Sequence, residues 1–153
     1  MKRHEVRQKA LQALFEIDLG RGDANDAMAH VMEEVAAVQP QDVKYLHWLV
    51  LGTRENRADL DDVLEAHVEG WKLNRMARVD LNVLRMALYE LQYEHDVDVA
   101  TICNEAVELA KDFSTDESGK FVNGVLARVL PNATAARARN HDRHSDDSSD
   151  TVD

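Results

Sequence analysis

Cysteine is almost absent from this chain of 153 residues, in which Cys103 is the single example. One cysteine cannot form an intramolecular disulfide, and it rules out a cysteine-rich zinc site. We expect Cys103 to be a small core or half-buried thiol rather than a nucleophile. This cysteine usage fits a reducing cytoplasm.

Glycine, proline and aromatic residues are also scarce: the chain has six glycines, two prolines and 5% aromatics. Such a composition is poor for sheets and favours packed helices, so we predict an all-α fold. No run of apolar residues approaches the roughly 20 that a membrane helix needs, and the basic N-terminus lacks the apolar block of a signal peptide. We therefore expect a soluble, cytoplasmic protein.

Positive charge is in deficit, because the formal net charge is −11. A surface of this sign repels phosphates, which argues against general binding of polyanions. The first ten residues are the exception, since Lys2, Arg3, Arg7 and Lys9 face Glu5 alone and give a local charge of +3. Any contact with nucleic acid should therefore be local and should involve this segment.

Apolar residues recur at steps of three and four along most of the chain, which is the pattern of helices with one buried stripe. The helix-breaking residues are Gly20, Gly22 and Pro40, and Ser114 to Glu117 form a capping-box pattern before the last helix. Seven helices are predicted, at about 3–19, 23–38, 41–50, 60–71, 79–93, 99–113 and from the capping box to 129. Residues 1–130 should form one domain.

After Pro131 the apolar periodicity disappears, and three arginines against five aspartates give residues 131–153 a charge of −2. We predict that this segment is a disordered acidic tail. One hypothesis is that it shields the basic N-terminus from unrelated nucleic acid.

No motif for catalysis is present, neither a nucleophile elbow, nor a glycine-rich phosphate loop, nor an HExxH helix. The histidines lack partners at the spacing of a closed metal site, and His141 and His144 lie in the predicted tail. We therefore expect no enzyme activity, no catalytic residues, no metal and no cofactor.

Three segments carry polar residues that core packing does not require: LR-x-A-x-YEL at 84–91, NEAVELAK-x-F at 104–113 and KFVNGVL at 120–126. With Arg7 and the ALQALF run at 10–15, these motifs resemble the NusB family in order and separation. The resemblance covers about residues 3 to 130. It implies a seven-helix fold of two packed helical halves, in agreement with the helix count from periodicity.

The resemblance also implies a function. NusB pairs with NusE, a small-subunit ribosomal protein, and the pair binds the boxA element of nascent ribosomal RNA and joins the RNA polymerase antitermination complex. By resemblance, two sets of positions are expected to make these contacts. The RNA-facing set is Lys2, Arg3, Arg7, Glu117, Lys120 and Phe121, and the NusE-facing set is Phe15, as an apolar anchor, and Asp80, as a carboxylate.

Simpler interpretations of these residues stay open. Arg3 and Arg7 can be a solvated helix face, Phe121 a core residue, and Asp80 only a residue that suits a helix start. Hydrogen bonding and close helix packing are the expected roles of Asn104, Glu105, Asn123 and Gly124. The N-terminus has fewer arginines than is usual in the family and Asp98 replaces a frequent proline, so RNA affinity without NusE is expected to be weak.

Two other functions are compatible with such a domain. NusB-like domains also precede the catalytic part of ribosomal RNA methyltransferases, where they help to hold RNA. Alternatively, the helical surface self-associates, as in a homodimer, and takes no part in RNA binding.

Overall fold

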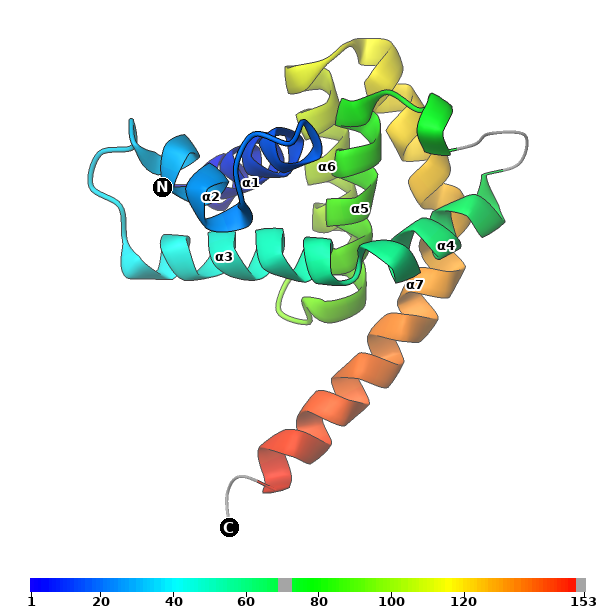
Figure 1. The fold of residues 1–153 in the computed structure, drawn as a ribbon. Helices are drawn as coiled ribbons and strands as arrows, with labels where there is room; N and C mark the ends of the chain where they lie inside the picture. Colours follow the sequence, from blue (N-terminus) through cyan, green and yellow to red (C-terminus); the bar gives the residue numbers. More distant parts are fainter. Residues whose placement is uncertain (69–72, 151–153) are drawn as a thin grey trace.

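The computed structural model describes residues 1–68 and 73–150, except for the side chains of Asn74 and of residues 143–150. This part of the chain is helical and contains no strand, as the composition predicts (Figure 1). The elements are α1 (Arg3–Asp18), α2 (Ala24–Met32), α3 (Pro40–Glu55), α4 (Arg57–His67), a short 3₁₀ helix (Leu73–Arg75), α5 (Arg78–Tyr93), α6 (Val99–Phe113) and α7 (Asp116–Asp150).

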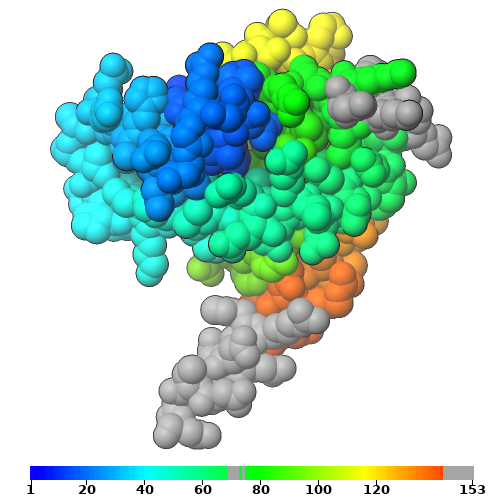
Figure 2. Space-filling model, viewed as in Figure 1, coloured from blue at the N-terminus to red at the C-terminus, as the bar shows by residue number. Residues whose placement is uncertain are grey.

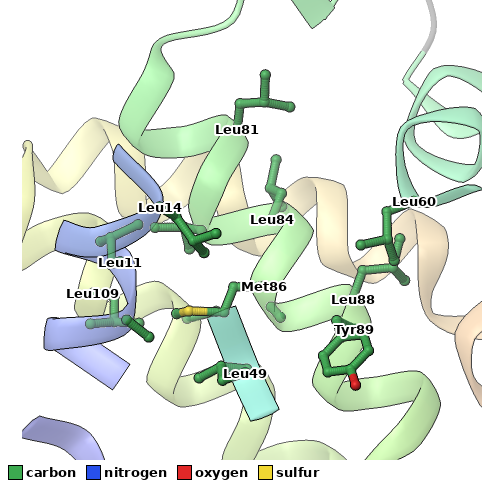
Figure 3. Packing of buried hydrophobic residues seen from close by; sticks show 14 of the residues in the cluster. Leu11, Leu14, Leu49, Leu60, Leu81, Leu84, Met86, Leu88, Tyr89 and Leu109 are labelled. Carbon is green, nitrogen blue, oxygen red and sulfur yellow. The ribbon is translucent and has the colours of Figure 1, made fainter. Parts of the chain in front are cut away.

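Helix α5 is the centre of the fold, and residues 80–91 are all buried. It is packed by α1 and α3 on one side and by α4, α6 and α7 on the other, which gives the two helical halves expected from the resemblance. Figure 3 shows Leu84 and Leu88 of α5 among leucines that the neighbouring helices contribute. Because α5 is enclosed on every side, its polar residues are buried as well, among them Arg85 and Glu90.

Several helix boundaries follow from local chemistry. Asp23 caps α2, its carboxylate accepting a hydrogen bond from the backbone N–H of Asp26 at 2.8 Å. The predicted helix to residue 38 instead ends at Met32, and Ala37 has a φ of 54°. Pro40, expected to block that helix, occupies the first turn of α3, where its missing N–H costs nothing. The fourth helix ends at His67, and Trp71 lies outside the described residues.

The start of α7 differs by one residue from the predicted capping box. Thr115, not Ser114, caps the helix: its Oγ1 accepts a hydrogen bond from the backbone N–H of Ser118 at 3.1 Å. The hydroxyl of Ser118 donates to Ser114 Oγ at 2.9 Å, so all three polar side chains hold this turn together.

The prediction of a disordered tail from residue 131 is wrong for the part of the tail whose side chains are described. Helix α7 continues through Pro131 and projects from the body of the molecule (Figure 1), and its orange part in Figure 2 lies directly against that body. Ala133 is fully buried, and Arg137 donates to the carbonyl oxygens of Leu91 (3.1 Å) and Val97. Asn140 donates to the carbonyl of Gln92 at 2.9 Å. Arg137 and Asn140 thereby satisfy the carbonyls of Leu91 and Gln92 at the end of α5, which have no partner within that helix, and Arg137 also binds the segment between α5 and α6.

No described helix is both long and apolar enough to span a membrane.

Candidate nucleic-acid interface

The cationic N-terminal segment lies at the start of α1, where Lys2 is the residue before the helix and Arg3 is its first residue. Both side chains are exposed. The Arg3 guanidinium lies over the ring of Tyr45 in α3, 3.5 Å from the ring centroid, which is a cation–π contact. This contact holds Arg3 at the surface in a defined position, with the edge of its guanidinium available to an anion.

Arg7 does not belong to this exposed set, and its predicted contact with RNA does not fit the structure. Only 3% of its side chain is exposed, and its guanidinium donates to the Glu90 carboxylate through Nε (2.9 and 3.2 Å) and Nη2 (2.9 Å). The hydroxyl of Tyr45 donates to the same carboxylate at 2.7 Å, and burial raises the pKa of this tyrosine well above its usual value. Arg7 therefore joins α1 to α5 and is not available to a phosphate.

His4 connects the start of α1 to α6. Its Nδ1 contacts the Glu105 carboxylate, and its Nε2 lies 3.2 Å from Asp112 Oδ2. The hydrogen bond to Glu105 is the largest influence on His4 and raises its pKa, against a smaller effect of burial. Asp112 also accepts a weak hydrogen bond from Gln8 at 3.4 Å.

The start of α7 lies near this end of α1. Asp112 contacts α1 and precedes Asp116, the first residue of α7, by four positions, so at most about 14 Å of chain separates them. The side chains of Glu117 and Lys120 are 86% and 77% exposed and form a loose ion pair at 3.8 Å. Phe121 is half-buried and packs against the core, so it combines a core role with a partly exposed ring.

The predicted anchor for the protein partner, Phe15, is half-buried on α1. It lines a surface pocket of about 400 Å³ between α1 and the α2 region. Two apolar residues, Phe15 and Val31, line the pocket together with Gln12 and side chains of both charge signs, which are Lys9, Glu16, Arg21, His30, Glu33 and Glu34. A half-exposed aromatic ring in a pocket of this size can accommodate an apolar side chain of another protein.

Asp80 does not present a carboxylate at the surface, in contrast to its predicted role. The residue is 7% exposed, and its Oδ1 has no hydrogen-bond partner among the described atoms. Burial raises the pKa of this carboxyl group, and a hydrogen bond with Ser118 opposes that effect. Because Asp80 is enclosed between the first turns of α5 and α7, the interpretation as a helix-start residue describes it better.

Four residues were expected to fix helix packing, namely Asn104, Glu105, Asn123 and Gly124, and only Glu105 does so. Glu105 bonds to His4 as described above. Asn104 and Asn123 are exposed, and an added Cβ at Gly124 would meet nothing within 4 Å. The glycine that allows close packing is Gly52, where a Cβ would lie 2.0 Å from the Tyr89 ring.

No group of three histidine, cysteine, aspartate or glutamate side chains that could hold a metal is found among the described residues. Cys103 is half-buried, and burial raises the pKa of its thiol. This environment is that of an unreactive structural thiol, as predicted.

The model of the NusB family matches residues 4–131. The chain belongs to the NusB family. It is 48% identical to the transcription antitermination protein NusB of Geobacillus kaustophilus over 129 residues, which cover 84% of this chain and 95% of that protein. The corresponding protein of Bacillus pumilus is 43% identical over the same shares of the two chains.

Solved structures agree with this assignment of the NusB family. The NusB of T. maritima superimposes with a TM-score of 0.78 at 35% identity, over 84% of this chain and 90% of that one. A crystal structure of the antitermination factors NusB and NusE in complex with double-stranded RNA gives 0.76 at 25% identity, over 86% and 99% of the two chains. The part of α7 beyond residue 131 lies outside the family match.

Sequence reasoning missed two groups of buried polar residues. Tyr45 and Glu90 are the partners of Arg7, and Asp18 at the end of α1 collects arginines from α4 and α5. One sequence feature could have indicated these buried groups: Arg85 and Glu90 lie off the apolar stripe of α5, in a helix otherwise rich in apolar residues.

Proposed function

We propose that this chain is a transcription antitermination factor that acts without catalysing a reaction. In this proposal it forms a heterodimer with NusE, binds boxA RNA in nascent ribosomal RNA and joins the RNA polymerase antitermination complex. The observation that carries the proposal is family membership at 48% identity to a NusB antitermination protein, 95% of whose length is matched. Because relatives of this name are matched almost end to end, antitermination is favoured over a role as one part of a methyltransferase.

The proposed RNA contacts are the exposed members of the predicted set. Lys2 and Arg3 supply charge to phosphates, and Lys120 adds a third cation at the start of α7. Phe121, which is half-buried, supplies an aromatic ring to an unstacked base, and Glu117 offers acceptor oxygens to base or ribose donors. Phe15 and its pocket form the proposed contact with NusE.

The distribution of charge over the protein supports this assignment. The chain carries −11 overall, so most of its surface attracts a basic ribosomal protein and repels RNA. RNA contact is then confined to the few exposed cations near the start of α1 and of α7. We accordingly expect weak RNA binding by the protein alone and stronger binding with NusE present.

The experiment is a gel-shift titration of boxA-like RNA with the protein, with and without NusE, at several salt concentrations. Reversal of Lys2 and Arg3 to glutamate should abolish the shift of the protein alone. With NusE present, the plot of log affinity against log salt should become less steep by about 1.4, or about 0.7 for each of two lost phosphate contacts. The matched control reverses Arg128 and Arg139, two exposed arginines of α7, with the same change in net charge.

The control variant should bind like the wild type. Equal loss in both variants would mean that net charge alone governs binding, and no shift of the wild type even with NusE would refute the proposed function.

A further inference from the structure

Three arginines converge on one carboxylate where the end of α1 meets α4 and α5. Asp18, whose side chain is 7% exposed, lies 4.0 Å from Arg57 Nη1, 3.6 Å from Arg78 Nη1 and 3.6 Å from Arg85 Nη1. Its Oδ2 also accepts a hydrogen bond from Asn82 at 2.9 Å. Arg54, at the end of α3, lies beside them and completes a set that we call the arginine cluster: Arg54, Arg57, Arg78 and Arg85.

The cluster has more donors than its own carboxylates use. Arg85 is 5% exposed and is satisfied by a bidentate pair with Asp61 at 2.7 and 2.9 Å. Arg57 and Arg78 are 54% and 58% exposed, and within the described residues they approach carboxylates only at 3.6 to 4.0 Å, without a hydrogen bond. Arg54 is exposed and has no ion pair among the described residues. The four arginines therefore have only two carboxylates, Asp18 and Asp61, as ion-pair partners among the described residues, which leaves donors of Arg54, Arg57 and Arg78 without a hydrogen-bonded acceptor there.

A small cavity opens beside these donors. It has a volume of about 30 Å³ and is lined by Arg54, Arg57, Arg85, Asp18 and Thr53 among others. Thr53 is 2% exposed, and its hydroxyl has no hydrogen-bond partner among the described atoms. A space of this size admits one or two oxygen atoms, since a water needs about 10 to 15 Å³ on this measure. It therefore suits the end of one anionic side chain that a larger molecule presents.

The arrangement of the arginines favours a single anion over an RNA backbone. RNA phosphates are met by cations distributed along the strand, whereas these arginines converge on one point. The cluster is also remote from the proposed RNA contacts, because Arg3 and Asp18 are the two ends of α1, fifteen residues or roughly 22 Å apart. Phe15, the proposed NusE anchor, precedes Asp18 by three residues and lies on the same side of α1.

We propose that the arginine cluster binds a carboxylate side chain of NusE. This inference rests on the proposed function and extends its partner surface from Phe15 to the junction of α1, α4 and α5. An acidic protein attracts a basic ribosomal protein in many orientations. A single contact in which this chain supplies the cations and NusE supplies the anion fixes which orientation is stable. Arg57, which lines the cavity, and the exposed Arg78, which approaches the same Asp18, make the contact, while Arg85 and Asp18 hold the surrounding side chains in position.

The test is calorimetric titration of NusE into the full-length protein in the absence of RNA. R57E/R78E should weaken binding at least about tenfold at low salt, and the difference should shrink as salt screens the contact. R57Q/R78Q, which removes charge without adding repulsion, should give an intermediate loss. The control is R128E/R139E, which carries the same net charge as R57E/R78E and should stay within about twofold of wild type. Circular dichroism spectra should show that all variants remain folded.

The outcomes separate the inference from the proposed function. If the wild type binds NusE and R57E/R78E binds as well as the control, only the inference is refuted. Failure of the wild type to bind NusE refutes the proposed function together with the inference. If R57E/R78E leaves NusE binding intact but weakens RNA binding more than the control does, the cluster is a phosphate site and the inference is also overturned.

Discussion

Replacement of Arg7 by methionine tests whether this arginine is a structural or an RNA-facing residue. Methionine keeps the apolar stem of the side chain but leaves the Glu90 carboxylate, 2% exposed, without its cation. Removing one member of a buried ion pair costs about 3–5 kcal/mol, because the remaining charge is left uncompensated. At about 2–4 °C of melting temperature per kcal/mol in a protein of this size, we expect a decrease of roughly 6–20 °C.

The assay is urea unfolding followed by circular dichroism, with thermal melting as a second readout. A triple variant, R7M/Y45F/E90M, removes all three polar partners together and should recover most of the lost stability. The exposed Arg3→Met serves as the matched control and should change stability by no more than about 1 kcal/mol, the scale of one cation–π contact. A loss below about 0.5 kcal/mol for Arg7→Met would refute the buried pair and restore the prediction that this guanidinium faces solvent.

His4→Gln should destabilise the protein at acidic pH only, because the pKa of His4 is raised in the folded protein. The stabilising effect of His4 is complete below about pH 6.5 and disappears as pH rises through the raised pKa. Melting curves of the wild type and the variant from pH 5.5 to 9 would show this difference. Gly52→Ala should cost about 1–3 kcal/mol by collision with Tyr89, whereas Gly124→Ala, with open space, should add about 0.5–1 kcal/mol; equal effects in urea unfolding would contradict this packing. Arg137→Gln should cost about 1–3 kcal/mol in the same assay, and no loss would indicate that the helix beyond Pro131 is not docked.

Helix positions were predictable because a single apolar stripe describes most of these helices. The sixth helix was predicted at 99–113 and is observed as Val99–Phe113, since its buried residues, Ile102, Ala106, Leu109 and Ala110, form one regular apolar stripe. Helix α5 shows the limit of this reasoning. It is buried on all sides, so a stripe analysis recognises its leucines but not that Arg85 and Glu90 are enclosed too.

The candidate site was less predictable, because burial of a charged residue depends on partners distant in sequence. Arg7 and Arg3 are four residues apart and look alike in sequence, yet the carboxylate that fixes Arg7 is 83 positions away. Asp80 has the same ambiguity, since a carboxylate in the first turn of a helix is favourable whether it is exposed or enclosed.

The extension of α7 was missed for a different reason. Ala133, Ala136, Arg137 and Asn140 recur at helical spacing, but two of these residues are polar and the others small, so no apolar stripe is visible. Arg137 and Asn140 make hydrogen bonds to backbone carbonyls, which the sequence of the accepting segment does not reveal.

Because Arg3 lies over Tyr45, the intrinsic fluorescence of the protein can report on ligand binding. Tyr45, beneath Arg3, is followed by Trp48 at a ring separation of 5.3 Å, and Trp48 is followed by Tyr89 at 4.7 Å. A ligand that displaces the guanidinium alters the field around this row of rings, so the emission of Trp48 should respond to occupancy without any attached dye. With Trp71, the second tryptophan of the chain, changed to phenylalanine, that indole becomes the only source of tryptophan emission.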